Sequence, residues 1–313
     1  MIIDKPLGLG STQVVSAVKR GLKSGGYPKV KVGHGGTLDP LASGVLPVAL
    51  GEATKLCGRM LDADKIYDFT IGFGAETDTL DGEGEVVATS DIRPSLEEIQ
   101  QILPGFTGEI EQVPPVYSAL KIDGKAAYAR ARAGEDLEMK VRRVTVHSLS
   151  VWAELVEALP FPSLDRDEKD SPSTSSGQAV DEVTLTARVS KGNYIRSLAR
   201  DIARALGTVG HVTMLRRSKA GPFTLDQAIS LDKLEELSKA RQLEQTLLPL
   251  TAGLDDIPAL PVTPDQAGLL RQGRKLTGIA VQPGLHLATE GSVPVALVEL
   301  FEGGLRVVRG FNV

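Results

Sequence analysis

The stretch Gly33-His34-Gly35-Gly36-Thr37-Leu38-Asp39-Pro40-Leu41-Ala42-Ser43-Gly44-Val45-Leu46-Pro47 is the most informative part of this sequence. Its glycines and prolines predict a loop of unusual backbone conformation, because glycine accepts positive φ and proline fixes φ. The loop holds one histidine, His34, and one aspartate, Asp39, five residues apart. Asp39 before Pro40 is also a good helix N-cap with a proline in the first turn. The segment by itself favours that structural role over a chemical one.

Around this segment, short stretches of alternating residues indicate strands. Tyr67, Phe69, Ile71 and Phe73 alternate with small or polar residues, the period-2 pattern of a strand. Similar strands are predicted at 116–122, 145–154, 183–190 and 211–215. A capping box predicts a helix over 95–103, and an apolar stripe predicts another over 195–206. Because no regular βαβ rhythm appears, we expect an α+β fold with a mixed or antiparallel sheet.

The length of 313 residues predicts two domains, which we place at 1–250 and 251–313. The second begins with a linker-like stretch at 253–258. A first-turn proline at 264 and a hairpin signal around 301–304 then predict a small, mostly β module. Residues 162–182 are rich in Ser, Pro, Asp and Lys without periodicity, so we expect a long, mobile surface loop there.

Composition excludes several classes of protein. No stretch approaches the roughly 20 apolar residues of a membrane helix, and the start does not resemble a signal peptide. A single cysteine, Cys57, excludes an internal disulfide and a multi-cysteine zinc site. The four histidines show no ligand spacing, and phosphate-loop, nucleophile-elbow and His-Glu-x-x-His motifs are missing. We therefore expect a cytoplasmic protein without a metal or cofactor.

The net charge of −5 argues at first against a nucleic-acid partner, but the charges are unevenly distributed. Residues 1–31 carry a net +5 and residues 188–219 a net +7, whereas residues 76–111 carry a net −9. The basic segments predict a face that attracts phosphates, and scattered, solvated charges are the alternative. On the first interpretation, Arg200 and Arg204 lie exposed on one helix, and the acidic stretch with Glu83, Glu85, Glu97 and Glu98 faces away from the nucleic acid.

Further motifs follow the 33–47 segment in an order that resembles the bacterial tRNA pseudouridine-55 synthases. They are Asp4-Lys5-Pro6-x-Gly8, Gly51-Glu52-Ala53-Thr54-Lys55, Asp64-Lys65-x-Tyr67, Thr77-Asp78-Thr79-x-Asp81, Pro114-Pro115-x-Tyr117-Ser118-Ala119, Lys191-Gly192-x-Tyr194-Ile195-Arg196-Ser197, Leu215-Arg216-Arg217 and Gly221-Pro222-Phe223. Because so many motifs follow in the family's order, a catalytic role for Asp39 is favoured over a role as a helix N-cap alone.

The resemblance implies a pseudouridine synthase catalytic domain followed by a PUA-like RNA-binding module. It implies isomerisation of uridine 55 in the T-loop of tRNA, by an enzyme that needs no cofactor, metal or protein partner and acts as a monomer. Two alternatives stay open. One is a guide-RNA-dependent pseudouridine synthase subunit, and the other is a tRNA-folding chaperone or RNA-binding module in which catalysis is secondary.

The resemblance also implies roles for a set of active-site residues. Asp39 matches the essential carboxylate, which acts as a nucleophile or as a base. Arg196 matches the arginine that orients it, and Asp81 the acid that holds this arginine. Tyr67 matches the tyrosine that stacks on the uracil near the C5 proton. Structural alternatives are a solvated helix face for Arg196 and a core position for Tyr67.

Four further residues are predicted to bind the substrate. Tyr194 resembles a second pocket residue, and His34 would fill the space that a flipped base leaves. Lys5, in the motif that begins at Asp4, and Lys191, in the motif that ends at Ser197, are predicted to bind the substrate through their positive charges. Phosphates of the T-arm would be held by the two basic segments together with Lys121, Arg130, Arg132, Arg142 and Arg143.

Overall fold

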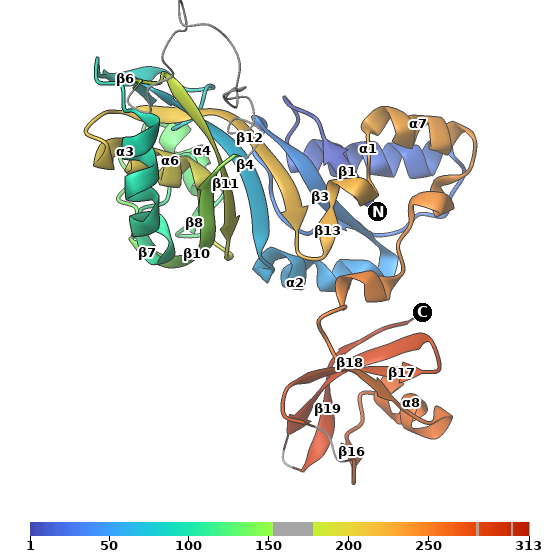
Figure 1. Cartoon of the computed structure of the whole chain (residues 1–313). Coiled ribbons are helices and arrows are strands. Elements are labelled where there is room, and N and C mark those ends of the chain that lie inside the picture. The colour runs from blue at the N-terminus through green and yellow to red at the C-terminus, as the bar shows by residue number, and fades with distance from the viewer. Residues whose placement is uncertain (153–177, 280–281, 302, 313) are drawn as a thin grey trace, which may run out of the picture.

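The computed structural model of the chain describes residues 1–152, 178–279, 282–301 and 303–312. A ten-stranded sheet with helices around it makes up the larger part, and a separate five-stranded sheet lies below it in Figure 1. Most of the predicted 162–182 loop lies outside the described residues, and strand β11 begins at Glu182.

The large sheet is mixed. Its strand order is β14-β1-β3-β12-β4-β11-β10-β7, with β2 paired to β3 and β13 paired to β12. The pairs β1/β14 and β3/β12 are parallel, and the other pairs are antiparallel. The predicted α+β class with a mixed sheet is confirmed. The strands are β1 (Ile2–Lys5), β2 (Val32–His34), β3 (Ala42–Leu50), β4 (Lys65–Phe73), β7 (Gly108–Gln112), β10 (Arg142–Val151), β11 (Glu182–Val189), β12 (Gly210–Ala220), β13 (Phe223–Thr224) and β14 (Ala228–Ile229).

Helices flank this sheet on two sides. In Figure 1, α1 and α7 lie together at one end, and α3 and α6 at the other. The α-helices are α1 (Ser11–Ser24), α2 (Cys57–Asp62), α3 (Leu96–Ile102), α4 (Ala127–Arg132), α6 (Ile195–Ala205) and α7 (Leu231–Lys239). Short 3₁₀ helices span Gly51–Leu56, Leu103–Phe106, Leu225–Gln227, Leu243–Thr246 and Leu250–Gly253. Two hairpins, β5 (Ala75–Thr77) with β6 (Val86–Thr89) and β8 (Lys121–Ile122) with β9 (Lys125–Ala126), form small sheets of their own.

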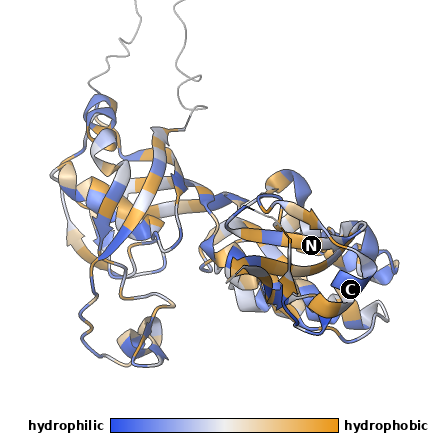
Figure 2. Cartoon of the chain, turned by 90° about the horizontal axis from the view of Figure 1, so that it is seen from below, coloured by the Kyte–Doolittle hydropathy of each residue, from blue (hydrophilic) through white to orange (hydrophobic). Residues whose placement is uncertain are grey.

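The core follows the predicted periodicities. Phe69, Ile71 and Phe73 of β4 are buried on one face of the sheet, as their alternation predicts. The α6 stripe that includes Leu198 and Ile202 is buried in the same core. Figure 2 shows the corresponding bands of hydrophobic residues along the strands. Burial of these apolar faces fixes which side of β4 and of α6 meets the cavity described below.

The second sheet contains the C-terminal residues and has a core of its own around Val295 and Leu305. Its order is β15-β17-β18-β19-β16, and the predicted hairpin is the antiparallel pair β18/β19. The elements are β15 (Ala259–Pro261), α8 (Pro264–Arg271), β16 (Leu276–Thr277), β17 (Leu285–Glu290), β18 (Val293–Phe301) and β19 (Gly304–Gly310). Lys55 of the larger part donates to the carbonyl of Gly310 at 2.9 Å.

Two local predictions are wrong. The predicted loop at 33–47 is in large part strand, because β2 ends at His34 and β3 begins at Ala42, and no helix follows Asp39. The predicted strand at 116–122 is mostly turn, with only the short β8 at its end. Among the described residues, no helix is long and apolar enough to span a membrane.

Candidate active site

The loop between β2 and β3 presents Asp39, and its backbone is held by buried donors on both sides. Ser11 of α1 accepts from the Leu38 N–H at 2.8 Å and donates to the Leu38 carbonyl at 3.1 Å. The Pro40 carbonyl accepts from the Gly8 N–H at 2.9 Å and from Lys5 Nζ at 3.3 Å. Because these partners fix the residues on either side of Asp39, the carboxylate is presented from a rigid backbone.

Arg217 of β12 holds the start of the same loop from inside the core. Its side chain is almost fully buried and donates to the carbonyls of Val45 at 2.8 Å and Gly36 at 3.2 Å. Gly44 permits this packing, because its φ is +102° and an added Cβ would lie 2.2 Å from the Arg217 carbonyl oxygen. Any side chain at Gly44 would therefore force β3 away from β12.

Arg196, in the first turn of α6, joins Asp39 to a second carboxylate. Its Nη2 lies 2.7 Å from Asp39 Oδ2, and its Nη1 lies 3.2 Å from Asp81 Oδ2. The arginine and Asp81 side chains are 6% and 4% exposed, whereas that of Asp39 is 40% exposed. Arg196 also donates to the carbonyls of Thr79 and Tyr117. The arrangement aims a charged, accessible carboxylate into a cavity while its partners stay buried.

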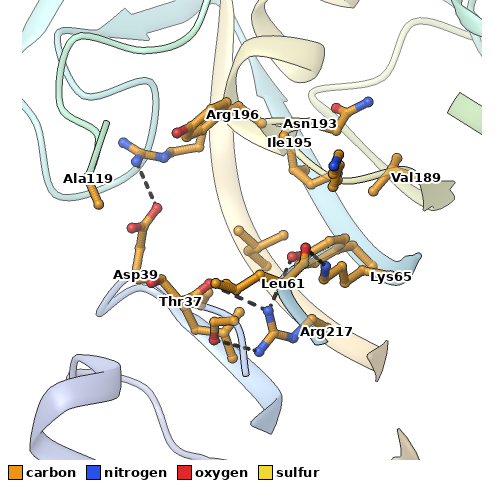
Figure 3. Close-up of a pocket in the computed structure, with 18 of the residues that line it drawn as sticks. Thr37, Asp39, Leu61, Lys65, Ala119, Val189, Asn193, Ile195, Arg196 and Arg217 are labelled. Carbon is orange, nitrogen blue, oxygen red and sulfur yellow. Dashed lines mark hydrogen bonds and ion pairs between the residues drawn. The ribbon is translucent and has the colours of Figure 1, made fainter. Parts of the chain in front are cut away.

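That cavity has a volume of about 280 Å³ and is shown in Figure 3. Tyr67, Tyr194 and Lys191 line it together with Asp39 and Arg196. Tyr67 comes from β4, and its hydroxyl lies 3.5 Å from Arg217 Nη1. Burial raises the pKa of the Tyr194 phenol. The structure thus brings five of the eight predicted site residues to one cavity that holds a carboxylate and two aromatic rings.

His34 and Asp81 line a second cavity of about 410 Å³, which shares Asp39 and Arg196 with the first. The His34 Nδ1 atom is buried and has no hydrogen-bond partner in the described part of the chain. Burial, with a contribution from the positive charge of Arg217, lowers the pKa of His34. A neutral, flat ring with an unused polar atom therefore faces a space beside Asp39.

Lys5 does not occupy the position predicted for it. Its side chain is 0% exposed, and its Nζ donates to the carbonyls of Leu9 at 2.5 Å, Pro6 at 3.0 Å and Pro40 at 3.3 Å. Burial lowers its pKa to about 8. A fully enclosed ammonium cannot contact an RNA phosphate, so Lys5 supports the loop from behind. Lys191, by contrast, is exposed at the cavity and pairs with Asp62 at 3.1 Å.

Several predicted surface charges are placed differently from expectation. The Arg200 side chain is only 12% exposed and pairs with Asp201, although Arg204 is exposed as predicted. Glu83 lines the cavity that holds His34, so this part of the acidic stretch does not face away from the site. Arg130 is paired with both Asp123 and Glu135, which neutralise it locally. Formal charge in a sequence window therefore overstates the free positive charge on the surface.

The sequence analysis gave Lys65 no role and counted Arg217 only among the phosphate-binding cations of the 188–219 segment, which its burial contradicts. Lys65, the first residue of β4, lines the cavity and is buried. The signal that could have found them is a cation inside an otherwise apolar, alternating strand. In Leu215-Arg216-Arg217, alternation places Arg217 on the same face as Leu215.

The fold has a counterpart among solved structures. A chain in the structure of an H/ACA ribonucleoprotein bound to a substrate RNA containing 2′-deoxyuridine is similar in fold, with a TM-score of 0.68 and 24% identity. The likeness covers 100% of this chain and 85% of that one. It extends over both sheets, including the C-terminal one.

Sequence comparisons identify the particular family. Residues 23–162 match the N-terminal domain of the TruB family pseudouridylate synthases, and residues 196–255 match the tRNA pseudouridylate synthase B C-terminal domain. The tRNA pseudouridine synthase B of Novosphingobium aromaticivorans is 61% identical over 100% of this chain and 96% of its own length. That of Zymomonas mobilis is 58% identical over 100% of this chain and 95% of its own length. The chain belongs to the TruB family.

Proposed function

We propose that this chain isomerises uridine to pseudouridine in tRNA, at position 55 of the T-loop. The observation that supports this proposal most directly is the Asp39 carboxylate, which is accessible in a cavity beside Tyr67 and is held by the buried Arg196. The chain that carries it is a member of the TruB family. Relatives that match this chain over its full length are named tRNA pseudouridine synthases, which favours this activity over a binding-only protein or a guide-dependent subunit.

The chemistry moves uracil from an N-glycosidic to a C-glycosidic bond on the same ribose. Asp39 supplies the carboxylate that attacks the sugar or the ring, or removes a proton from the sugar. Arg196 fixes the direction of this carboxylate through a charge-assisted hydrogen bond. The bonds made and broken lie within one nucleotide, so no oxidant or reductant enters the balance.

The aromatic residues have separate tasks in this proposal. Tyr67 stacks on the extruded uracil, and its hydroxyl takes part in removing the C5 proton. Tyr194 lines the same cavity and contributes a second wall. His34 fills the gap that the flipped base leaves in the T-loop, which offsets part of the cost, a few kcal/mol, of unstacking a base. Its neutral state at pH 7 suits a stacking role.

We assign residues 1–250 to catalysis and residues 251–313 to a PUA-like appendage that adds RNA contacts. The separate apolar core of the second sheet supports this division. Exposed cations near the cavities, including Arg132 and Lys191, would contact the T-arm phosphates. In this proposal the protein works in the cytoplasm as a monomer, without a protein partner or cofactor.

The test is tritium release from tRNA labelled at uridine C5, with Asp39→Asn as the variant. We expect Asp39→Asn to abolish release while tRNA affinity stays within about tenfold, because one carboxylate does the chemistry and many cations bind the RNA. Turnover above one percent of wild type in purified Asp39→Asn would overturn the assignment of Asp39. Wild-type protein that binds tRNA without releasing tritium would overturn the proposed activity.

A further inference from the structure

Lys65 places a positive charge at the wall of the cavity, and the mechanism proposed above gives this charge no role. Its side chain is 7% exposed, and its Nζ donates to the carbonyls of Leu61 at 2.6 Å and Ala63 at 2.5 Å. Figure 3 shows Lys65 on the side of the cavity away from Asp39, near Arg217. The two neutral carbonyls orient the ammonium without cancelling its charge.

The cavity as a whole is rich in positive charge. Asp39 is the one carboxylate among its lining residues. Four cations line it: Lys65, Lys191, Arg196 and Arg217. Arg196 is paired with Asp39 and Asp81, and Lys191 is paired with Asp62. Lys65 and Arg217, in contrast, form no ion pair with any residue in the described ranges.

A buried cation without a counter-anion is costly unless a ligand supplies the missing charge. Burial, with a contribution from Arg217, lowers the pKa of Lys65 to about 8, so most of the population is still charged at pH 7. The Arg217 guanidinium lies 6.0 Å from the centroid of the Tyr67 ring. Asp62 and Asp64 attract Lys65 only from beyond ion-pair distance, so two cations without a direct carboxylate partner lie on the wall where we place the uracil.

The proposed reaction produces an anion at this place. When the C1′–N1 bond breaks, its electron pair stays on the base, and the detached uracil carries one negative charge spread over N1, O2 and O4. The charge disappears when C5 bonds to C1′, the C5 proton leaves and N1 gains a proton. We infer that Lys65 stabilises the uracil anion between these steps, an inference that rests on the proposed function.

An RNA phosphate is the other anion that could meet Lys65. The cavity favours the base, because Lys65 is buried at the first residue of β4, two residues before Tyr67, whereas the exposed Lys191 is available for the backbone. A phosphate contact would show as lost RNA affinity, and a contact to the uracil anion as a slower chemical step at unchanged affinity.

The experiment compares Lys65→Met and Lys65→Gln, which remove the charge, with Lys65→Arg, which keeps it. Lys233→Met on α7 is the control, because Lys233 is exposed and pairs with Glu236. Single-turnover pseudouridine formation and filter binding are measured with a T-arm RNA. A second RNA carries 5-fluorouridine at the target, and loss of 5-fluorouridine is followed after nuclease digestion. Thermal melting reports on the fold of each variant.

We expect the neutral variants to lower the single-turnover rate by about 10²-fold, comparable to the loss of one oxyanion donor, with dissociation constants within about threefold of wild type. Lys65→Arg should recover most of the rate. The deficit should shrink with 5-fluorouridine, because fluorine at C5 stabilises negative charge on the ring.

Three results would overturn the inference. They are a neutral variant with a rate within threefold of wild type, a loss confined to affinity, or equal deficits for uridine and 5-fluorouridine. If both neutral variants fail to fold, Lys65→Arg decides, because it keeps the charge: a folded Lys65→Arg protein with unchanged RNA affinity and a rate about 10²-fold below wild type on both RNAs contradicts a charge effect on the base. Failure of wild type itself to form pseudouridine would instead refute the proposed function.

Discussion

Replacing Asp81 by asparagine tests the buried charge pair behind Asp39. Asp81 Oδ1 accepts from the Thr79 hydroxyl at 2.6 Å and from the Glu83 N–H at 3.1 Å, and an asparagine carbonyl retains both contacts. The substitution therefore acts on Oδ2, which lies 3.2 Å from Arg196 Nη1. It removes one negative charge and turns an NH₂ group toward a guanidinium.

The size of the effect follows from the partners that remain. Removing one member of a buried ion pair costs about 3–5 kcal/mol when the other charge is left alone. Arg196 keeps Asp39 and two backbone carbonyls, so we expect a loss below that range, about 2–3 kcal/mol, in the free energy of unfolding. At roughly 2–4 °C per kcal/mol, the melting temperature should fall by about 4–12 °C.

The same change should slow the reaction, because Arg196 sets the direction of Asp39. A displacement of about 1 Å at a reacting group costs on the order of 10²-fold in rate, so we expect turnover to fall by one to two orders of magnitude. Urea unfolding and tritium release measure the two effects. Asp91→Asn, just after the same hairpin, is the control, because Asp91 is exposed and forms no ion pair with any described residue. An Asp81→Asn protein with wild-type stability and turnover would refute the reasoning.

Three further predictions test the remaining parts of the site. Tyr67→Phe should block product formation and leave melting almost unchanged, because the ring and its packing stay; wild-type turnover would reduce Tyr67 to a packing residue. Because the pKa of His34 is lowered in the folded protein, the unfolded chain takes up a proton first as the pH falls, so the free energy of unfolding should decrease below about pH 6.5. The decrease should be smaller in His34→Gln. If the urea midpoint shifts equally in wild type and His34→Gln between pH 7.5 and 5.5, this prediction is wrong. Arg132→Glu should weaken tRNA binding and flatten the plot of log affinity against log salt by about one unit, whereas Glu97→Lys on α3 should change neither; a wild-type slope near −1 would mean that the docking face is misplaced.

Patterns within one element were readable from the sequence. The alternation at 67–73, the stripe at 195–206 and the Ser95–Glu98 capping box each appear as predicted. These features depend on neighbours in the chain, because a strand or an amphipathic helix repeats its pattern locally. The motif order then pointed to Asp39, Tyr67 and Arg196, which the structure brings to one cavity.

What depends on distant partners was not readable. Lys5 is buried because the chain from Pro6 to Leu9 turns back over its ammonium and the Pro40 carbonyl closes the site from a distance, which the sequence pattern does not indicate. Arg130 and Arg200 look like free surface cations until their acidic partners are known. The roles of Arg217 and Lys65 require knowing that β12 lies beside β3 and β4. The parts of the site that depend on contacts between distant segments could therefore not be predicted from the sequence alone.

The central place of β12 also constrains how a growing chain can reach its working form. Strands β3 and β4 are made early, yet they do not pair with each other, because β12 inserts between them some 140 residues after β4. Until then, each has an open edge able to recruit a wrong neighbour. Arg196 and Arg217 are also made late, so a ribosome-bound chain that stops before them presents Asp39 without the guanidinium that orients it. Asp39 is therefore oriented only after β12 has joined the two parts of the large sheet.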